Sequence, residues 1–365
     1  MEIFNRVFLH KAVRVGLRKA DALVGRLYSI QRTLDKMSIR PYELHLELTN
    51  VCNANCVFCP YQFQKREFVV MQDEVFHKAV GDYVSSGGGS VGLTPIVGDA
   101  LIDPKFLDRV RYLRSQPKID RIWLTTNAIL LDKHGIKDVL EVGLSSITIS
   151  TSGFDEATYE RIYRSKAYQR VRNNVLALLE ENAKRPNPIP IAIGLRSDRP
   201  LTEVIADPDF QQILAYKPEI DFTWSYTSAN GRITEEILPP GMRLRVVNDR
   251  KESCVQTFNG PMVLADGTVM ACSCVASVDG AEDLGIGNVM DANLAAIWTG
   301  EKVKKLRASF GTNQLNPTCS GCDMYRDLEM YRTSEGRTRA KLNLARYNGV
   351  NAKNRSKPKG SFSGG

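Results

Sequence analysis

Three cysteines that follow a strand-like segment are the residues of this chain best suited to chemistry. Cys52, Cys56 and Cys59 have three and then two residues between them. A loop of this length can wrap three corners of a cubane iron–sulfur cluster and leaves one iron open for a small molecule. A structural zinc ion needs a fourth ligand nearby, and the nearest histidine, His45, lies within the preceding strand-like segment. A zinc fragment or a chance spacing is the alternative.

Five further cysteines lie toward the C-terminal end of the chain. Cys254, Cys272 and Cys274 flank a hairpin-like segment, and Cys319 and Cys322 form a distant Cys-x-x-Cys pair. A hairpin and such a pair can converge on one metal centre, which on spacing alone could be zinc or an iron–sulfur cluster. Cys274 is then left over. It could be a spare ligand, an inert buried thiol or a hydrogen-atom donor to a carbon radical.

An alternation of strand-like and helix-like segments begins at Pro41 and must position the first cysteines. The strand-like segments are residues 43–48, 90–94, 121–126, 145–150, 189–195 and 221–226. Helix-like segments between them include residues 73–84, 104–113 and 168–181. This order predicts an α/β fold with a parallel sheet, either an open sheet or a partial barrel. In both, chemistry sits at the carboxyl ends of the strands, where Cys52 falls.

The cysteine loop, with Phe58 before its last cysteine, resembles the CxxxCxxC hallmark of the radical S-adenosylmethionine (SAM) superfamily. The resemblance covers about residues 41–330 and implies a partial (β/α)6 TIM-like barrel. It also implies a 4Fe-4S cluster on Cys52, Cys56 and Cys59, whose open iron binds SAM. Such enzymes cleave SAM reductively to a 5′-deoxyadenosyl radical, which abstracts hydrogen from the substrate.

Four further positions match SAM-binding motifs of this superfamily, in order along the chain. Asp99 stands where the Gly-Gly-Glu motif has glutamate, and its carboxylate suits a hydrogen bond to the SAM ammonium. Asn127 lies in a segment similar to Thr-Asn-Gly, with Ala128 replacing the glycine. Ser150 opens a segment similar to Ser-x-Asp-Gly, which implies contact with the SAM ribose. Arg196 could pair with the SAM carboxylate or make an ordinary surface ion pair.

The C-terminal cysteines resemble the auxiliary-cluster domains of the same superfamily, the long SPASM form and the short Twitch form. A Cys-x(n)-Gly-x4-Cys hairpin matches at Cys254, Gly267 and Cys272. Because no cysteine follows Cys322, the short form matches better. It implies one auxiliary 4Fe-4S cluster, with the ligands Cys254, Cys272, Cys319 and Cys322. Cys274 then becomes a candidate catalytic hydrogen donor.

These patterns divide the chain into four parts. They are a basic amphipathic N-terminal helix (1–40), a radical SAM core (41–240), a Twitch/SPASM-like auxiliary cluster domain (241–332) and a basic, flexible tail (333–365). Apolar residues recur near helical spacing over residues 3–31. The boundary near Pro240 is placed where the alternation of strands and helices gives way to turns and cysteines.

The net charge of +8 comes from the two ends of the chain. Basic ends could contact nucleic acid, anionic lipid or a phosphorylated partner, or could simply be solvated. No apolar run approaches the roughly 20 residues of a membrane-spanning helix, and the first residues lack a clean hydrophobic stretch typical of a secretory signal. We therefore expect a cytoplasmic protein, with the N-terminal helix as a candidate membrane-surface contact and no specific nucleic acid partner.

Four cysteine ligands would leave the auxiliary cluster without an open iron, which favours a role as electron acceptor. The leading hypothesis is a radical SAM oxidoreductase or epimerase that dehydrogenates or epimerises a small carbohydrate-like substrate, as short-form relatives do. An external one-electron reductant of the flavodoxin or ferredoxin type is implied. One alternative is a maturase that modifies a peptide or protein side chain, and a more distant one is a non-catalytic zinc or nucleic-acid-binding protein.

Overall fold

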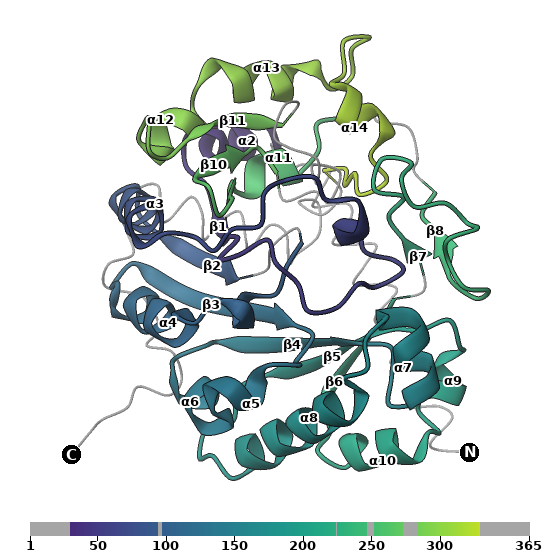
Figure 1. Ribbon diagram of the computed structural model, residues 1–365. Helices are drawn as coiled ribbons and strands as arrows, with labels where there is room; N and C mark the ends of the chain where they lie inside the picture. Colours follow the sequence, from purple (N-terminus) through teal and green to yellow (C-terminus); the bar gives the residue numbers. More distant parts are fainter. Residues whose placement is uncertain (1–29, 94–96, 224, 247–251, 273–283, 329–365) are drawn as a thin grey trace, which may run out of the picture.

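One mixed sheet organises the molecule (Figure 1). The computed structural model describes residues 30–93, 97–223, 225–246, 252–272 and 284–328 of the 365-residue chain. Within these residues, nine strands pair in the order β11-β10-β9-β1-β2-β3-β4-β5-β6. A separate pair is formed by β7 and β8.

The first six strands are parallel and follow the chain from one neighbour to the next. They are β1 (Glu43–Leu46), β2 (Gly89–Leu93), β3 (Ile119–Thr126), β4 (Ser146–Thr151), β5 (Ile191–Arg196) and β6 (Glu219–Thr223). β6 ends the strand order, so the sheet curves without closing, as in a partial barrel. The predicted α/β fold with six parallel strands is confirmed.

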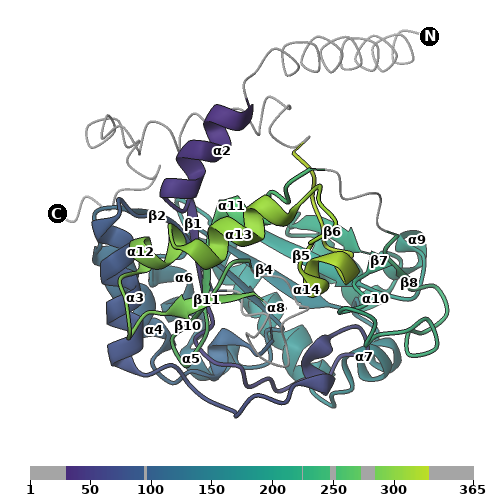
Figure 2. The ribbon, with the colours of Figure 1, turned by 90° about the horizontal axis from the view of Figure 1, so that it is seen from above.

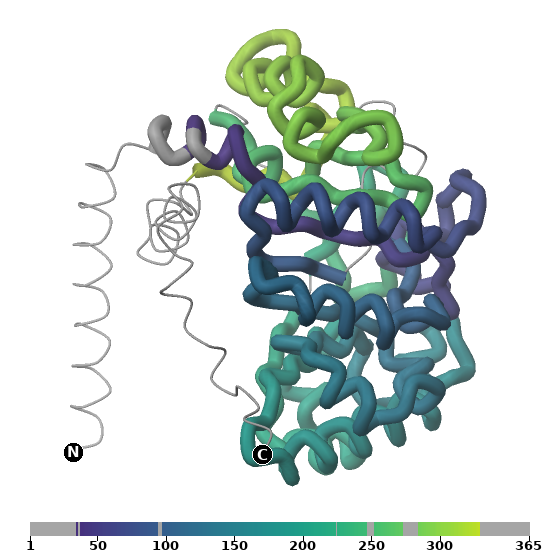
Figure 3. Tube along the Cα trace, turned by 90° about the vertical axis from the view of Figure 1, so that its left-hand side faces the viewer, coloured from purple at the N-terminus to yellow at the C-terminus, as the bar shows by residue number. Residues whose placement is uncertain are grey.

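Helices between the strands cover one face of this sheet, as Figures 1 and 3 show. They are α3 (Asp73–Ser85), α4 (Phe106–Ser115), α5 (Leu131–His134), α6 (Ile136–Glu141), α7 (Glu156–Tyr163), α8 (Tyr168–Ala183), α9 (Leu201–Val204) and α10 (Pro208–Leu214). Short 3-10 helices follow β1 and β2 at Pro60–Phe63 and Ala100–Ile102. Each crossover returns the chain to the amino end of the next strand, so all six carboxyl ends lie at one edge.

The opposite face of the sheet, called the inner face here, carries polar side chains. In β4, Ile147 and Ile149 are buried, whereas Ser146, Thr148 and Ser150 on the inner face are only half-buried. The period of two along a strand sends alternate side chains to opposite faces. Parallel sheets are usually apolar and covered on both faces. A polar, accessible inner face is therefore a place for a ligand.

The C-terminal segment extends the same sheet beyond β1. β9 (Met262–Val263) pairs in parallel with β1, and β10 (Thr268–Met270) pairs antiparallel with both β9 and β11 (Gly285–Asn288). Four helices accompany these strands, namely α11 (Gln256–Asn259), α12 (Leu294–Trp298), α13 (Glu301–Ser309) and α14 (Pro317–Gly321). Figure 2 shows α12 and α13 beside α2 (Ile30–Ile39). The cysteine-rich segment therefore shares the core of the barrel.

The sixth strand differs from the expectation that one strand covers residues 221–226. β6 ends at Thr223, and Ser225–Tyr226 forms β7, which pairs with β8 (Arg243–Leu244). The Tyr226 hydroxyl donates a hydrogen bond to the Thr223 carbonyl at 2.6 Å, where the chain leaves the sheet. This run is β-favourable throughout, so strand propensity gave no sign of the break.

The predicted N-terminal helix over residues 3–31 lies almost entirely outside the described residues, and so does the predicted membrane-surface contact. A helix that begins at Ile30 continues to Ile39. Its Met37 carbonyl accepts a hydrogen bond from the indole of buried Trp298 at 3.1 Å. No helix in the described part of the chain is long and apolar enough to cross a membrane.

Candidate metal centres

The N-terminal cysteine loop lies at the carboxyl end of β1 and is fastened to the end of α7. The Asn55 and Val57 amides donate hydrogen bonds to the carbonyls of Tyr163 (3.1 Å) and Ile162 (2.9 Å). Helix C-termini leave carbonyls without partners, and here the loop supplies the donors. The loop is thereby held between the first strand and the fourth βα unit.

The three thiols of this loop face one another in a poorly solvated space. Burial raises the pKa of the Cys52 thiol to about 12 and that of Cys59 to about 11. Burial also raises the pKa of Cys56, which is further raised by the negative charges that Cys59 and Cys52 would carry. Protein burial thus disfavours the free thiolates, and a bound metal cluster would restore them.

Two hydrogen bonds point at the sulfurs of this loop. The Asn127 side-chain amide donates to Cys52 Sγ at 3.8 Å, and the Tyr61 amide donates to Cys59 Sγ at 3.5 Å. Donors aimed at cysteine sulfurs stabilise thiolate ligands of iron–sulfur clusters. The donor set, the mutual proximity of the thiols and these bonds all fit a three-cysteine cluster.

Aromatic side chains surround the loop. Phe58 stacks on Tyr226 with ring centroids 5.2 Å apart and meets Tyr163 edge-on at 5.6 Å. Tyr163 in turn stacks on Tyr159 at 5.0 Å. The guanidinium of Arg196 lies 6.0 Å from the Phe58 ring. Only Phe58 was identified from the sequence, because the other rings come from distant segments without a shared motif.

Asp99 lies at the carboxyl end of β2, surrounded by donors from its own loop and the next one. Its carboxylate accepts hydrogen bonds from the Thr126 hydroxyl (2.8 Å) and from the amides of Asn127 (2.8 Å) and Leu101 (3.0 Å). The side chain is buried, which raises its pKa despite these bonds. The structure therefore brings Asp99 to the predicted place and uses its oxygens to join two loops.

Two backbone positions near Asp99 have positive φ angles, one in the loop after β2 and one in the loop after β3. Gly98 has φ +95°, and an added Cβ would lie 2.4 Å from the Thr49 carbonyl oxygen. Ala128, which replaces the glycine of the related motif, also has a positive φ of 65°. A residue with a Cβ is strained at a positive φ, whereas glycine is not. The substitution of alanine at this turn is tolerated at a cost in stability.

Ser150 and Arg196 lie on the inner face below the cysteine loop. The Ser150 hydroxyl is 2.8 Å from the Tyr163 hydroxyl. Arg196 donates to the Gly194 carbonyl at 3.1 Å, and its positive charge offsets part of the burial that raises the pKa of both Cys56 and Cys59. No described residue forms a salt bridge with Arg196, so the surface ion pair expected as the alternative is not observed in the described part. Arg196 faces the cysteines.

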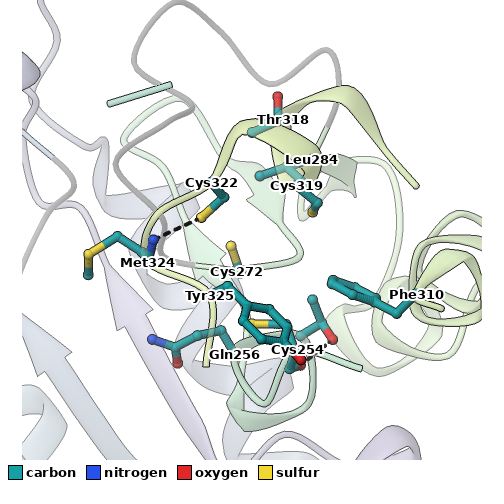
Figure 4. Close-up of a pocket in the computed structure, with 11 residues that line it drawn as sticks. Cys254, Gln256, Cys272, Leu284, Phe310, Thr318, Cys319, Cys322, Met324 and Tyr325 are labelled. Carbon is teal, nitrogen blue, oxygen red and sulfur yellow. Dashed lines mark hydrogen bonds between the residues drawn. The ribbon is translucent and has the colours of Figure 1, made fainter. Parts of the chain in front are cut away.

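Four C-terminal cysteines line one cavity, shown in Figure 4. They are Cys254, Cys272, Cys319 and Cys322. Their side chains point toward the same space, which Phe310, Tyr325 and Leu284 also line. The Met324 amide donates a hydrogen bond to Cys322 Sγ at 3.3 Å. Burial raises the pKa of Cys254. Four convergent thiols around a cavity fit an auxiliary cluster.

Across the described residues, no group of three or more His, Cys, Asp or Glu side chains is arranged to hold a single metal ion. Cys274, the candidate hydrogen donor, lies outside the described residues.

A short segment connects the two cysteine groups. Tyr226, which stacks on Phe58 of the first loop, is followed by Thr227 and Ser228. The Thr227 hydroxyl donates to the Asp323 carboxylate at 2.5 Å, and the Ser228 amide donates to the same group. Asp323 directly follows Cys322. Neither the stacking nor these bonds had a signal in the sequence.

Comparison with protein families identifies both centres. The radical SAM superfamily model matches residues 46–198, and the model of an iron–sulfur cluster-binding domain, SPASM, matches residues 254–323. This chain belongs to the radical SAM superfamily and carries a SPASM-type iron–sulfur domain. Its cofactors are therefore SAM, the 4Fe-4S cluster of the radical SAM domain and auxiliary iron–sulfur chemistry of the SPASM domain. Zinc in both cysteine groups, the distant alternative, is replaced by iron–sulfur.

Individual relatives match the chain only in part. A GTP 3′,8-cyclase of Clostridium perfringens is 31% identical over 145 residues, which are 39% of this chain and 44% of the relative. A GTP 3′,8-cyclase of Mannheimia succiniciproducens is 24% identical over 251 residues, covering 66% of this chain and 73% of the relative. The first match thus spans less than half of the cyclase.

Solved structures share the fold. SuiB of Streptococcus suis bound to the precursor peptide SuiA has a TM-score of 0.55 at 14% identity, over 78% of this chain and 70% of SuiB. BtrN in complex with AdoMet and 2-DOIA has a TM-score of 0.50 at 15% identity, over 77% of this chain and 92% of BtrN. At these identities the likeness establishes the architecture alone.

Proposed function

We propose that this protein cleaves SAM to abstract hydrogen from a small carbohydrate-like substrate, which it dehydrogenates or epimerises. Cys52, Cys56 and Cys59 would hold the cluster that leaves one iron open for SAM. When bound, the reduced cluster supplies the electron that breaks a carbon–sulfur bond of SAM and yields a 5′-deoxyadenosyl radical. Arg196, beside the cysteines, is the candidate partner of the SAM carboxylate.

The observation that carries the choice of substrate class is the polar inner face of the sheet. A cavity of about 490 Å³ opens on it, a size typical of small-molecule sites. Hydroxyl, carboxylate and guanidinium groups line it from three strands, β3, β4 and β6, and they belong to Arg121, Ser146, Thr148, Glu219 and Asp221. Such groups are donors and acceptors suited to a substrate rich in hydroxyls.

The strand register leads from this cavity to the cysteine loop. Thr148 pairs with Ala192, and Ser150, two residues further along β4, pairs with Gly194. Gly194 has no side chain, and the Arg196 guanidinium lies over it on the inner face, since an added Cβ at Gly194 would lie 2.8 Å from Arg196 Nη1. The cavity lies near the amino ends of these strands, so a substrate held there would have to extend along β4 for its reacting carbon to reach Ser150 and Arg196, next to the thiols.

The aromatic rings and the buried thiols would keep water from this end of the site. Tyr159, Tyr163 and Phe58 pack around Cys56, and Tyr163 is buried. A carbon radical is quenched by side reactions, so exclusion of solvent protects it. The Ser150 hydroxyl is hydrogen-bonded to the Tyr163 hydroxyl of this wall.

The four-cysteine cavity favours a two-electron oxidation. Cys254, Cys272, Cys319 and Cys322 would occupy every iron of a cluster, which leaves no position for substrate. After removal of a hydrogen atom from carbon and a proton from the hydroxyl, one electron remains on the substrate. We propose that the C-terminal centre accepts it, so that a secondary alcohol becomes a ketone. Cys274 remains the candidate hydrogen donor if the reaction is an epimerisation.

A peptide or protein maturase is the second candidate. It is favoured by the likeness to SuiB, whose structure holds a precursor peptide, although that likeness establishes the fold alone. The cyclase relatives act on GTP. Because GTP contains a ribose, this likeness is compatible with a substrate that contains a sugar. We further propose a cytoplasmic location and a one-electron reductant of the flavodoxin or ferredoxin type.

The test is a substrate search with anaerobically reconstituted protein. Sugars and cyclitols deuterated at single carbons are compared with peptides, and deuterium is followed into 5′-deoxyadenosine by mass spectrometry. We expect transfer from a secondary alcohol carbon, with a ketone product. Deuterium uptake from D₂O into the product would mark epimerisation instead. Transfer from peptides alone would establish the maturase, and absence of SAM cleavage by an iron-loaded protein would refute the whole proposal.

A further inference from the structure

Asn127 has every hydrogen of its side-chain amide committed within the protein. Its Nδ2 donates to Asn53 Oδ1 at 2.7 Å and to Cys52 Sγ at 3.8 Å. Its Oδ1 accepts from the Ile129 amide at 3.0 Å. A carboxamide has two donor hydrogens, and both are used by these partners. The side chain is also buried, so it offers no donor to an incoming ligand.

Asp99 fixes the position from which this amide acts. Its carboxylate holds the Asn127 backbone amide and the Thr126 hydroxyl, each at 2.8 Å, and the Leu101 amide at 3.0 Å. Only 3% of Asp99 is exposed. Three donors on a buried carboxylate form a rigid clamp, because releasing any of them would leave a buried polar group unsatisfied. The clamp joins the loops after β2 and β3 directly behind Cys52.

We infer that Asn127, held by Asp99, is a positioning residue that donates a hydrogen bond to the Cys52 sulfur and tunes the N-terminal cluster, and that neither side chain serves mainly as a SAM ligand. This inference rests on the proposal that Cys52 is a cluster ligand. Hydrogen bonds to cluster sulfurs stabilise the added electron and raise the midpoint potential. Partners that orient a ligand also fix its geometry.

The role has an electrostatic reason. The Asp99 carboxylate holds the Asn127 backbone amide, and the Asn127 side chain reaches the Cys52 sulfur. The Asn127 N–H brings the positive end of a dipole to that sulfur. The clamp thus places a hydrogen-bond donor at the Cys52 sulfur.

The first test replaces Asn127 by aspartate, which keeps the shape but removes both donor hydrogens. The midpoint potential of the SAM-binding cluster is measured by redox titration with electron paramagnetic resonance, and SAM affinity by equilibrium dialysis. We expect a more negative potential and less than about a tenfold change in SAM dissociation constant. An unchanged potential with SAM binding weakened about tenfold or more would overturn the inference.

The matched control is Asn53→Ser, which alters the other partner of the same amide and leaves the bond to Cys52 available. We expect its potential to remain near that of the wild type. If Asn127→Asp loses about four irons per chain while Asn53→Ser keeps them, the positioning role is supported. Equal iron loss in both variants would count against a special role for the sulfur contact.

Asp99→Glu provides a second test with opposite outcomes. It restores the glutamate of the related motif, so a side chain whose main task is to bind the SAM ammonium should bind SAM more tightly. A clamp cannot accept the extra methylene, and we expect a lower melting temperature, a more negative potential and no gain in SAM affinity. Tighter SAM binding with unchanged stability would overturn the inference. Should the proposed function itself be wrong, Cys52→Ala would retain the full iron content.

Discussion

The N-terminal cysteines lie within one loop of the chain, whereas the C-terminal cysteines come from a helix-preceding turn, a hairpin and a distant Cys-x-x-Cys pair. The first loop is held by backbone bonds from its own residues to the end of α7. The second group forms one cavity only because β9 and β10 join the sheet beside β1. Local sequence spacing is enough to define the first centre, and tertiary structure is needed to define the second.

The number of protein ligands separates the two centres chemically. Three cysteines leave an iron open and therefore suit SAM, while four leave none and suit electron transfer. The surroundings differ in the same sense. An aromatic wall and Arg196 face the three-cysteine loop, and the cavity of the four cysteines is lined mainly by apolar groups such as Leu284 and Phe310.

One buried ion pair connects the two regions. Glu47, after β1, accepts two hydrogen bonds from Arg66 at 2.8 and 2.7 Å and one from the Ala265 amide at 3.2 Å. Arg66 belongs to the chain returning from the cysteine loop, and Ala265 lies between β9 and β10. The two centres therefore share a structural element and are expected to respond together when it is broken.

The largest effect should come from removing one ligand at each centre. We expect Cys52→Ala to lower 5′-deoxyadenosine formation by about 10³-fold or more. Cys319→Ala should keep SAM cleavage but lose the oxidised product. Each variant should hold about four irons per chain instead of about eight. Iron and product assays, with circular dichroism as the folding control, test this pair. Loss of SAM cleavage in folded Cys319→Ala would contradict the division of roles.

Breaking the shared ion pair should come next. Arg66→Met leaves the Glu47 carboxylate buried without its cation, which we expect to lower the free energy of unfolding by about 3 kcal/mol. Urea denaturation measures the loss. Glu47→Leu combined with Arg66→Met removes both charges and should recover part of it. If Arg66→Met alone left the free energy of unfolding unchanged, the pair would not hold the two regions together.

The same pair predicts a pH dependence. Burial raises the pKa of Glu47, although Arg66 lowers it. A raised carboxyl pKa favours the protonated form in the fold, so its contribution is fully present below the unfolded value of 4.5 and is lost as pH rises through the folded pKa. Without Arg66 the loss should extend to higher pH. If the loss of unfolding free energy in Arg66→Met were the same from about pH 4 to about pH 8, this prediction would be contradicted.

A smaller effect is expected at the start of α7, which holds the first loop. The Asp155 carboxylate accepts a hydrogen bond from the Thr158 amide at 2.8 Å, and the bonds from Thr158 lower its pKa. Asp155→Ala should cost about 1 kcal/mol at neutral pH. The cap's contribution is present above the unfolded value of 3.8 and is lost as pH falls through the lowered folded pKa. The melting temperatures of the wild type and of Asp155→Ala should therefore become equal at acidic pH.

The smallest effect concerns strain beside Asn127. Ala128→Gly should raise the free energy of unfolding by up to about 1 kcal/mol, because φ of +65° is strained for alanine. Ala177→Gly, in the middle of α8, is the matched control and should lower it by about 1 kcal/mol. Equal destabilisation by both glycines would show that the turn at Ala128 is unstrained.

Most of the fold could be predicted from periodicity. The parallel strands around Leu44, Leu124 and Ile149 follow from alternating apolar runs between amphipathic helices. The end of β6 at Thr223 could not be predicted, because the residues on both sides favour strands and only the pairing of β7 with the distant β8 separates them.

The candidate sites divide in the same way. The spacing of Cys52, Cys56 and Cys59 predicts the first site, and the matched motifs predict Asp99 and Asn127 as further site residues. Their contacts were not foreseen. These two side chains are predicted to bind SAM, and in the structure they also bind Thr126, Cys52 and their neighbours. A sequence motif predicts which residue occupies a position, but it does not predict the hydrogen-bond partners of that residue in the fold.

By itself, the sequence determined the three-thiol loop, the order of strands and helices, and the presence of a second cysteine group. Those features depend on residues close together in the chain, where covalent spacing limits geometry. Only the tertiary structure decided that the four C-terminal thiols share a cavity, that the inner face of the sheet carries a polar cavity, and that Asn127 is bonded to both Asp99 and Cys52. These depend on contacts between distant segments, which pack to satisfy burial and hydrogen bonding across the whole chain.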